Sequence, residues 1–112
     1  MDKERLAKAG IDLQDMEERF EGHDDIFEKY LWRFKDDKHM QGVREGLAAE
    51  DYDKILEEAH AMKGLSGTLC MQQLYLDSSD VVLAVRNAEY DKVSGLIHKM
   101  EDSYEKIMNL YV

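Results

Sequence analysis

The 112-residue chain is predicted to form an all-α fold, an up-and-down antiparallel four-helix bundle with a short additional N-terminal helix. Three observations predict it. Proline is absent, and Leu, Glu, Lys, Ala and Met, which favour helix, are abundant. Apolar residues recur three and four positions apart over long segments. The connections between these segments are short and acidic, and short connections make successive helices antiparallel neighbours.

The first predicted element is a short leading helix over about residues 12–21. Leu13, Met16 and Phe20 lie three and four positions apart and give this segment one apolar face. Gly22 follows directly, and glycine is the residue that most often terminates a helix. We therefore place the bundle itself over about 24–111, and the whole chain, 1–112, is interpreted as one domain.

The first main helix of the bundle is expected to break near residues 35–38, "KDDK". One apolar stripe ends at Phe34, and the next is out of phase with it by roughly a third of a turn at about 100° per residue. The two stripes consist of Phe27, Tyr30, Leu31 and Phe34, and of Met40, Val43 and Leu47.

Three further helices are predicted over about 52–71, 73–88 and 90–110, with Asp51 as the N-cap of the first. Their buried faces are defined by residues at helical spacing. These are Ile55, Ala59, Met62, Ser66 and Leu69; then Leu74, Val81, Val82 and Val85; then Val93, Leu96, Ile97, Met100, Tyr104, Ile107 and Tyr111.

The composition excludes several classes of partner and location. The formal net charge is −10, so nucleic acid and anionic membrane surfaces are poor partners. No apolar run approaches the roughly 20 residues that a membrane-spanning helix needs, and the N-terminus lacks the apolar core of a signal peptide. The single Cys70 forms no internal disulfide and is interpreted as a small core residue. We expect a cytoplasmic protein.

The stretch "AHAMKGLSG", residues 59–67, carries the candidate site. His60 lies about 160° around the helix from Met62, the centre of the buried stripe, so it should face solvent. Gly64 and Gly67 follow it on the same face, although each glycine in a helix interior costs about 1 kcal/mol relative to alanine. We interpret the glycines as clearing the surface beside the imidazole.

Lys63 supplies the second indication of chemistry. At three positions after His60, its ammonium can reach an anion held on the imidazole ring. A neutral imidazole nitrogen is a nucleophile near pH 7 that can accept a phosphoryl group and pass it on. The combination of histidine, lysine and glycines favours this chemistry over an unimportant surface histidine.

The sequence at this point resembles the histidine phosphotransfer (HPt) domains of multistep two-component phosphorelays. The residues that carry the resemblance are "AHAMKGLSGTL", from Ala59 to Leu69, with His60, Met62, Lys63 and Gly64 on the family's H-x-[apolar]-K-G pattern. The order of the helices extends it over nearly the whole chain. Leu65, where a small residue is frequent, and Cys70, where a glycine is frequent, depart from the pattern.

The resemblance implies a phosphocarrier without kinase activity of its own, and without a cofactor or a metal site. His60 would exchange a phosphoryl group through Nε2 with the aspartate of a receiver domain, which supplies Mg²⁺; Lys63 would stabilise the phosphoryl oxygens and Gly64 would leave room for the receiver. The partners would be a response-regulator receiver domain, a hybrid sensor histidine kinase, or both, in a bacterial cytoplasm, and the protein would be a monomer. The predicted docking residues are Leu56, Gly64, Gly67, Met71 and Leu13.

Two alternatives differ in class. Glu57 and His60 form half of a di-iron or di-manganese bundle site, but no second Glu-x-x-His pair exists, since Phe20, Asp36 and Gly95 precede the other histidines by three positions. The other alternative is a non-catalytic acidic interaction module in which His60 has no chemical role. His23, His39 and His98 are interpreted as loop or surface histidines.

Overall fold

The computed structural model describes residues 2–112, and these residues form helices and turns with no β-strand. Local sequence explains several helix boundaries, since Asp2, Asp12 and Asp51 each accept a backbone N–H bond as N-cap. The helices are α1 (Lys3–Lys8), α2 (Leu13–Phe20), α3 (Asp24–Phe34), α4 (His39–Ala48), α5 (Tyr52–Thr68), α6 (Gln72–Arg86) and α7 (Tyr90–Met108), followed by the 3-10 turn η1 (Asn109–Tyr111).

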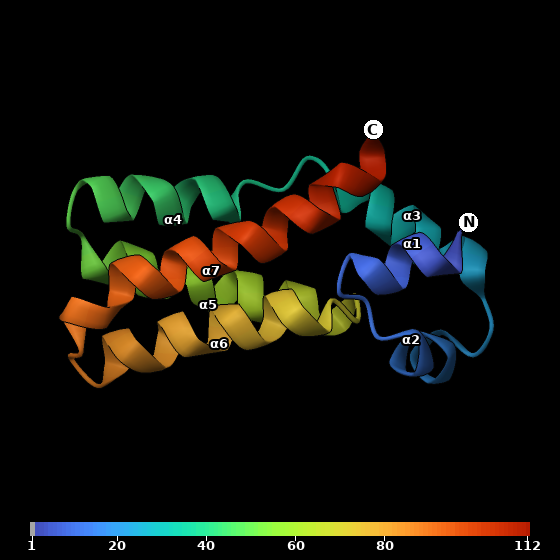
Figure 1. Ribbon diagram of the computed structural model, residues 1–112, viewed down its shortest axis with the longest axis horizontal. Coiled ribbons are helices and arrows are strands. Elements are labelled where there is room, and N and C mark those ends of the chain that lie inside the picture. The colour runs from blue at the N-terminus through green and yellow to red at the C-terminus, as the bar shows by residue number, and fades with distance from the viewer. Residues whose placement is uncertain (1) are drawn as a thin grey trace.

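The long helices α4 to α7 lie side by side along the long axis of the molecule, and the chain direction alternates from each to the next (Figure 1). Helix α5 packs between α4 and α6, and α7 packs on α6 and also contacts α4. The chain is therefore a helical bundle, with extents of 41 × 25 × 19 Å. Arg44 of α4 donates to Glu101 and Glu105 of α7 at 3.0 and 3.1 Å, which links the first and last of these helices.

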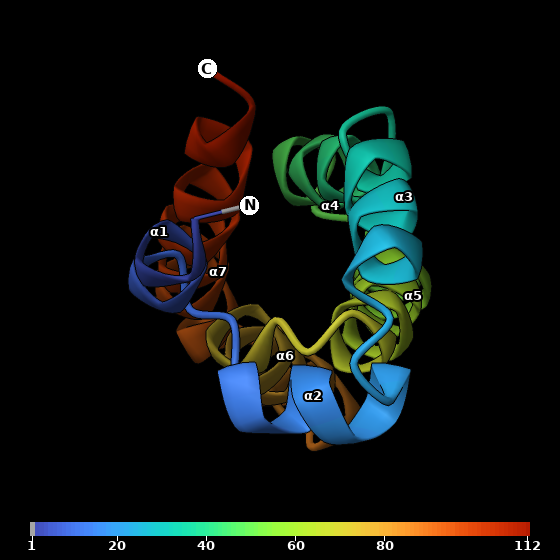
Figure 2. The same cartoon turned by 90° about the vertical axis from the view of Figure 1, so that its right-hand side faces the viewer.

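The three shorter helices gather at one end of the bundle. Viewed from that end, α1 lies beside α7, and α2 crosses beneath α5 and α6 (Figure 2). Two backbone hydrogen bonds fix the α1–α2 loop to the α5–α6 turn, from the Asp12 N–H to the Cys70 carbonyl at 2.8 Å and from the Gln73 N–H to the Gly10 carbonyl at 3.3 Å. They hold α2 against the C-terminal end of α5.

The predicted elements are largely confirmed. The leading helix, the break at 35–38 and the three C-terminal helices all occur, with boundaries shifted by a few residues at most. Helix α1 was not predicted. It has six residues, and of its apolar side chains Leu6 is buried, so its stability depends on contacts with the rest of the fold.

The core lies inside the bundle, and the buried faces predicted for α5, α6 and α7 are confirmed apart from Leu96 and Tyr111, which are half-buried. Close approach of α4 to α5 depends on Gly46, where a Cβ would lie 2.9 Å from Ile55 Cγ1 and 3.2 Å from its backbone nitrogen. Between α6 and α7, the buried carboxylate of Asp77 accepts hydrogen bonds from Ser103 and Gln73. Among residues 2–112, no helix has the length and apolarity needed to cross a membrane.

Candidate functional site

His60 lies near the middle of α5 and is exposed. On the opposite side of the same helix, Ile55, Ala59 and Met62 are fully buried, which confirms the prediction that the imidazole faces solvent. Within residues 2–112 no hydrogen bond or ion pair engages the His60 ring. Both ring nitrogens are therefore open to a partner.

A hollow of about 450 Å³ opens beside His60. It lies where α5, α6 and α2 meet, so it combines residues that are far apart in the sequence. Its lining comprises Asp15, Arg19, His60, Lys63, Gly64, Gly67, Thr68, Gln72 and Tyr75. The structure thus brings His60, Lys63, Gly64 and Gly67 together as the sequence predicted.

The two glycines of the hollow serve different purposes. A Cβ at Gly64 would meet no atom within 4 Å, so this glycine leaves open surface beside His60, as predicted. A Cβ at Gly67 would lie 3.1 Å from Cδ1 and 3.3 Å from Cε1 of Tyr75. Gly67 therefore admits the Tyr75 ring of α6 against α5, a packing role that was not predicted; it also lines the hollow, and its contact with a partner stays a prediction.

Lys63 lies on the wall of the hollow, half-buried, with Nζ 6.0 Å from the centre of the Tyr75 ring. At this distance the ring attracts the ammonium weakly, by about 0.5–1 kcal/mol at an exposed site. Lys63 forms no ion pair within residues 2–112. Its charge is accordingly available to an anion beside His60.

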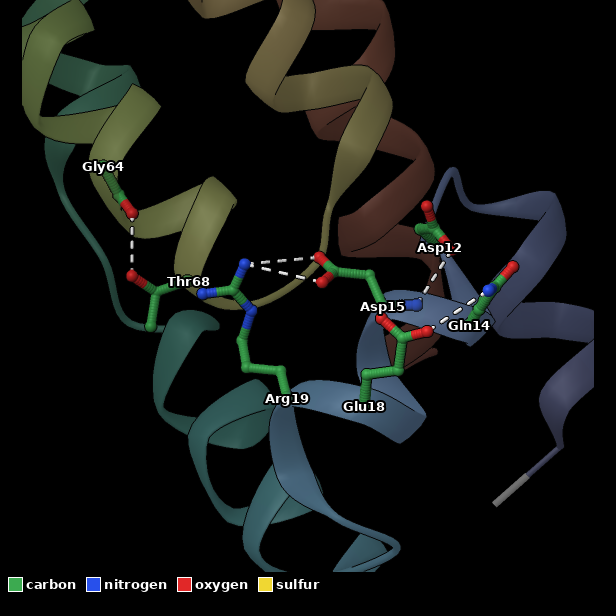
Figure 3. Close-up of polar contacts among 7 residues, drawn as sticks. All are labelled: Asp12, Gln14, Asp15, Glu18, Arg19, Gly64 and Thr68. Carbon is green, nitrogen blue, oxygen red and sulfur yellow. Dashed lines mark hydrogen bonds and ion pairs between the residues drawn. The ribbon is translucent and has the colours of Figure 1, made fainter.

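Arg19 and Asp15 of α2 complete the hollow, and sequence analysis did not identify them. Arg19 Nη2 lies 3.5 Å from both Asp15 carboxylate oxygens, the long limit of a hydrogen bond. Figure 3 shows the guanidinium extending from α2 to the C-terminal end of α5, beside Thr68. In the sequence, Asp15 and Arg19 have the i,i+4 spacing of an ordinary surface ion pair. Only the tertiary fold shows that they line the same hollow as His60.

The remaining predicted docking residues have different outcomes. Leu56 is half-buried one turn before His60. Leu13 begins α2 and is half-buried, but it does not line the hollow. Met71 is fully buried, so the prediction that it contacts a partner is wrong. The helix ends at Thr68, and Cys70, with φ 59°, reverses the chain so that Met71 enters the core.

The other histidines differ from one another. His23 and His98 are exposed, as predicted. His39 was predicted to be a loop or surface residue, but it is half-buried at the start of α4. Its Nδ1 lies 3.0 Å from Oε2 of Glu58, so it forms a polar contact between α4 and α5. No group of three or more His, Cys, Asp or Glu side chains in residues 2–112 is arranged to hold a metal ion.

Cys70 lies behind the hollow and is buried, as expected of a core residue. Burial, together with the hydrogen bond and the negative charge of Asp15, raises the pKa of its thiol to about 12. The thiolate is the reactive form, so we expect the native protein to resist Ellman's reagent at pH 8 and to react fully in denaturant. Rapid reaction of the native protein would show that this end of α5 opens.

The site can present a nucleophilic imidazole to a partner, with cations nearby for a bound anion. The exposed ring and the bare surface at Gly64 suit a large macromolecular partner, since little of the chain covers the imidazole. Comparisons of the chain with protein-family models, with curated proteins and with solved structures found no match.

Proposed function

We propose that the protein is a phosphocarrier of the histidine phosphotransfer type, which accepts and donates a phosphoryl group on His60. The observation that carries the proposal is the arrangement on α5. An exposed, unpaired imidazole has a lysine at i+3 and, at i+4, a glycine whose surroundings are open. The alternating helices α4 to α7 are consistent with the four-helix topology of such domains.

The chemistry requires little of this chain beyond position and charge. Nε2 of His60 attacks the phosphorus of a phosphoaspartate, the new N–P bond forms, and the P–O bond to the aspartate breaks, so the carboxylate leaves with the electron pair. Phosphoryl transfer depends chiefly on in-line placement and on neutralising the phosphoryl oxygens. Lys63 contributes one positive charge, and the receiver domain contributes Mg²⁺ and its acidic pocket.

The partners that follow from this proposal are a receiver domain and a hybrid histidine kinase in the cytoplasm, and the working form is a monomer. A dimer formed through the His60 face would cover the imidazole. The protein has no kinase reaction of its own in this scheme, because the phosphoryl group arrives from and returns to an aspartate.

A transfer assay tests the proposal directly. We expect incubation with phosphorylated receiver domains and Mg²⁺ to produce an acid-labile, base-stable phosphate on this chain. His60→Ala should abolish it, because no other side chain would present a nucleophile at that place. His98→Ala is the matched control, since His98 is also exposed but lies on α7, and it should transfer normally.

Two results would contradict the proposal. One is phosphate that persists in His60→Ala. The other is that no receiver of a broad panel transfers phosphate to the wild type, although the wild type and His60→Ala both bind a receiver. That second result would favour the non-catalytic interaction module.

A further inference from the structure

We infer that the hollow beside His60 is a phosphate-binding groove in which Arg19 of α2 is the second cation, in addition to Lys63 of α5. The inference deepens the proposed function, because a phosphoryl group on His60 is one source of such a phosphate. Free phosphate, or a phosphate group on another molecule, is the other source. The shared ligand chemistry is a phosphate dianion.

The first argument is the distribution of charge around the groove. The chain carries a net charge of −10, yet the charged lining residues besides His60 are two cations, Lys63 and Arg19, and one acid, Asp15. The cations come from different helices, and Gly64, where a Cβ would meet no atom within 4 Å, lines the same groove. An anion in this groove meets less repulsion than it would meet over most of the surface.

The second argument is the state of the Arg19 side chain. A guanidinium has five N–H donors; Nη2 of Arg19 lies 3.5 Å from the Asp15 carboxylate oxygens, and the guanidinium also interacts with the buried Cys70 thiol, so these two neighbours do not use all five. Arg19 is roughly half exposed, with a side-chain exposure of 48%. The donors that remain suit the paired oxygens of a phosphate, a geometry that arginine matches well.

The third argument concerns how Arg19 is held. Helix α2 is fixed to the α5–α6 turn by the backbone hydrogen bonds from Asp12 to Cys70 and from Gln73 to Gly10. The base of the Arg19 side chain is therefore anchored, while its tip can leave the long contact with Asp15. Asp15 holds the guanidinium at the groove when the groove is empty, and it competes with an incoming anion for the same donors.

The first test is titration of the unphosphorylated protein with inorganic phosphate, followed by NMR of the His60 ring and of the backbone amides of α5. We expect Arg19→Gln and Lys63→Gln each to weaken phosphate binding roughly fivefold. Asp15→Asn, which removes the competing carboxylate, should strengthen it. Arg86→Gln is the matched control, since it makes the same charge change at the far end of α6 and should leave binding unchanged.

The second test identifies the source of the phosphate and needs no receiver domain. Phosphoramidate phosphorylates histidine directly, because the ring nitrogen attacks phosphorus and ammonia leaves as the P–N bond breaks. If the groove serves the phosphoryl group on His60, Arg19→Gln should raise the pKa of that group in ³¹P NMR and Arg86→Gln should not. If Arg19→Gln instead weakens the binding of inorganic phosphate but leaves the pKa of the phosphohistidine unchanged, the groove binds free phosphate or a phosphate group of a partner.

The inference is overturned if Arg19→Gln matches the wild type in both tests, or if the wild type binds no phosphate and its phosphohistidine is indifferent to Arg19. Neither outcome would decide the proposed function, because the receiver transfer assay is independent of both. Conversely, if no receiver transfers phosphate to the protein, the phosphate titration still tests whether the groove binds phosphate.

Discussion

Gly64→Gln is expected to reduce phosphoryl transfer from a receiver by about 100-fold or more while the protein stays folded. The glutamine side chain would extend over the open surface beside His60 and keep a docked partner from reaching in-line distance, and misplacement by about 1 Å can cost a hundredfold in rate. The same change should raise helix stability by a few tenths to about 1 kcal/mol, because glycine is unfavourable in an exposed helix. Rapid-quench transfer assays and urea denaturation measure the two effects.

Gly95→Gln provides a matched control. Gly95 is exposed on α7, and a Cβ there also meets no atom within 4 Å, so the change in helix propensity is the same and the His60 face is untouched. Transfer by Gly95→Gln should equal that of the wild type. Equal inhibition by both variants would show that the loss does not arise from obstruction at His60. Unfolding of Gly64→Gln would contradict an exposed position.

Phe27→Ala is expected to have the largest effect on stability, a loss of about 3–5 kcal/mol in the free energy of unfolding. Phe27 is 1% exposed and packs edge to face on Phe20 of α2, with ring centres 5.3 Å apart. Truncation would leave a cavity where α2 and α3 meet. Because a domain of this size has a total stability of roughly 5–15 kcal/mol, the loss should be evident as a large fall in the urea midpoint.

Ile26→Ala is the control for Phe27→Ala. It removes an apolar side chain from the adjacent position of α3, but Ile26 is 42% exposed and should cost well under 1 kcal/mol. Similar losses for both variants would mean that α3 is not packed as described.

The features predicted correctly from sequence are those that depend on a single helix. The buried stripe of α5 and the exposure of His60 follow from a repeat of 3.6 residues, which holds wherever the helix is regular. The break after Phe34 was evident from two stripes out of phase. Met71 was misplaced because a helical wheel does not extend past Thr68, where the helix ends.

The features that sequence analysis missed depend on contacts between elements. The role of Gly67 is set by Tyr75, which belongs to the next helix, so no pattern within α5 indicates it. Arg19 reaches the groove because two backbone hydrogen bonds between loops position α2. The pairing of His39 with Glu58 joins residues 19 apart in the sequence and likewise follows from the packing of α4 on α5.

The position of His60 on a helix packed from both sides has a consequence for conformational entropy. Helix α5 contacts α4 and α6, so its backbone is already fixed before a partner arrives. If a receiver docks on His60 as proposed, ordering the imidazole side chain costs about 0.5–1.5 kcal/mol, whereas a histidine on a flexible loop would add roughly 1–2 kcal/mol for each backbone residue. Under the proposed function, a smaller contact area would then be enough for recognition, and a complex with a small contact area would dissociate quickly after each encounter.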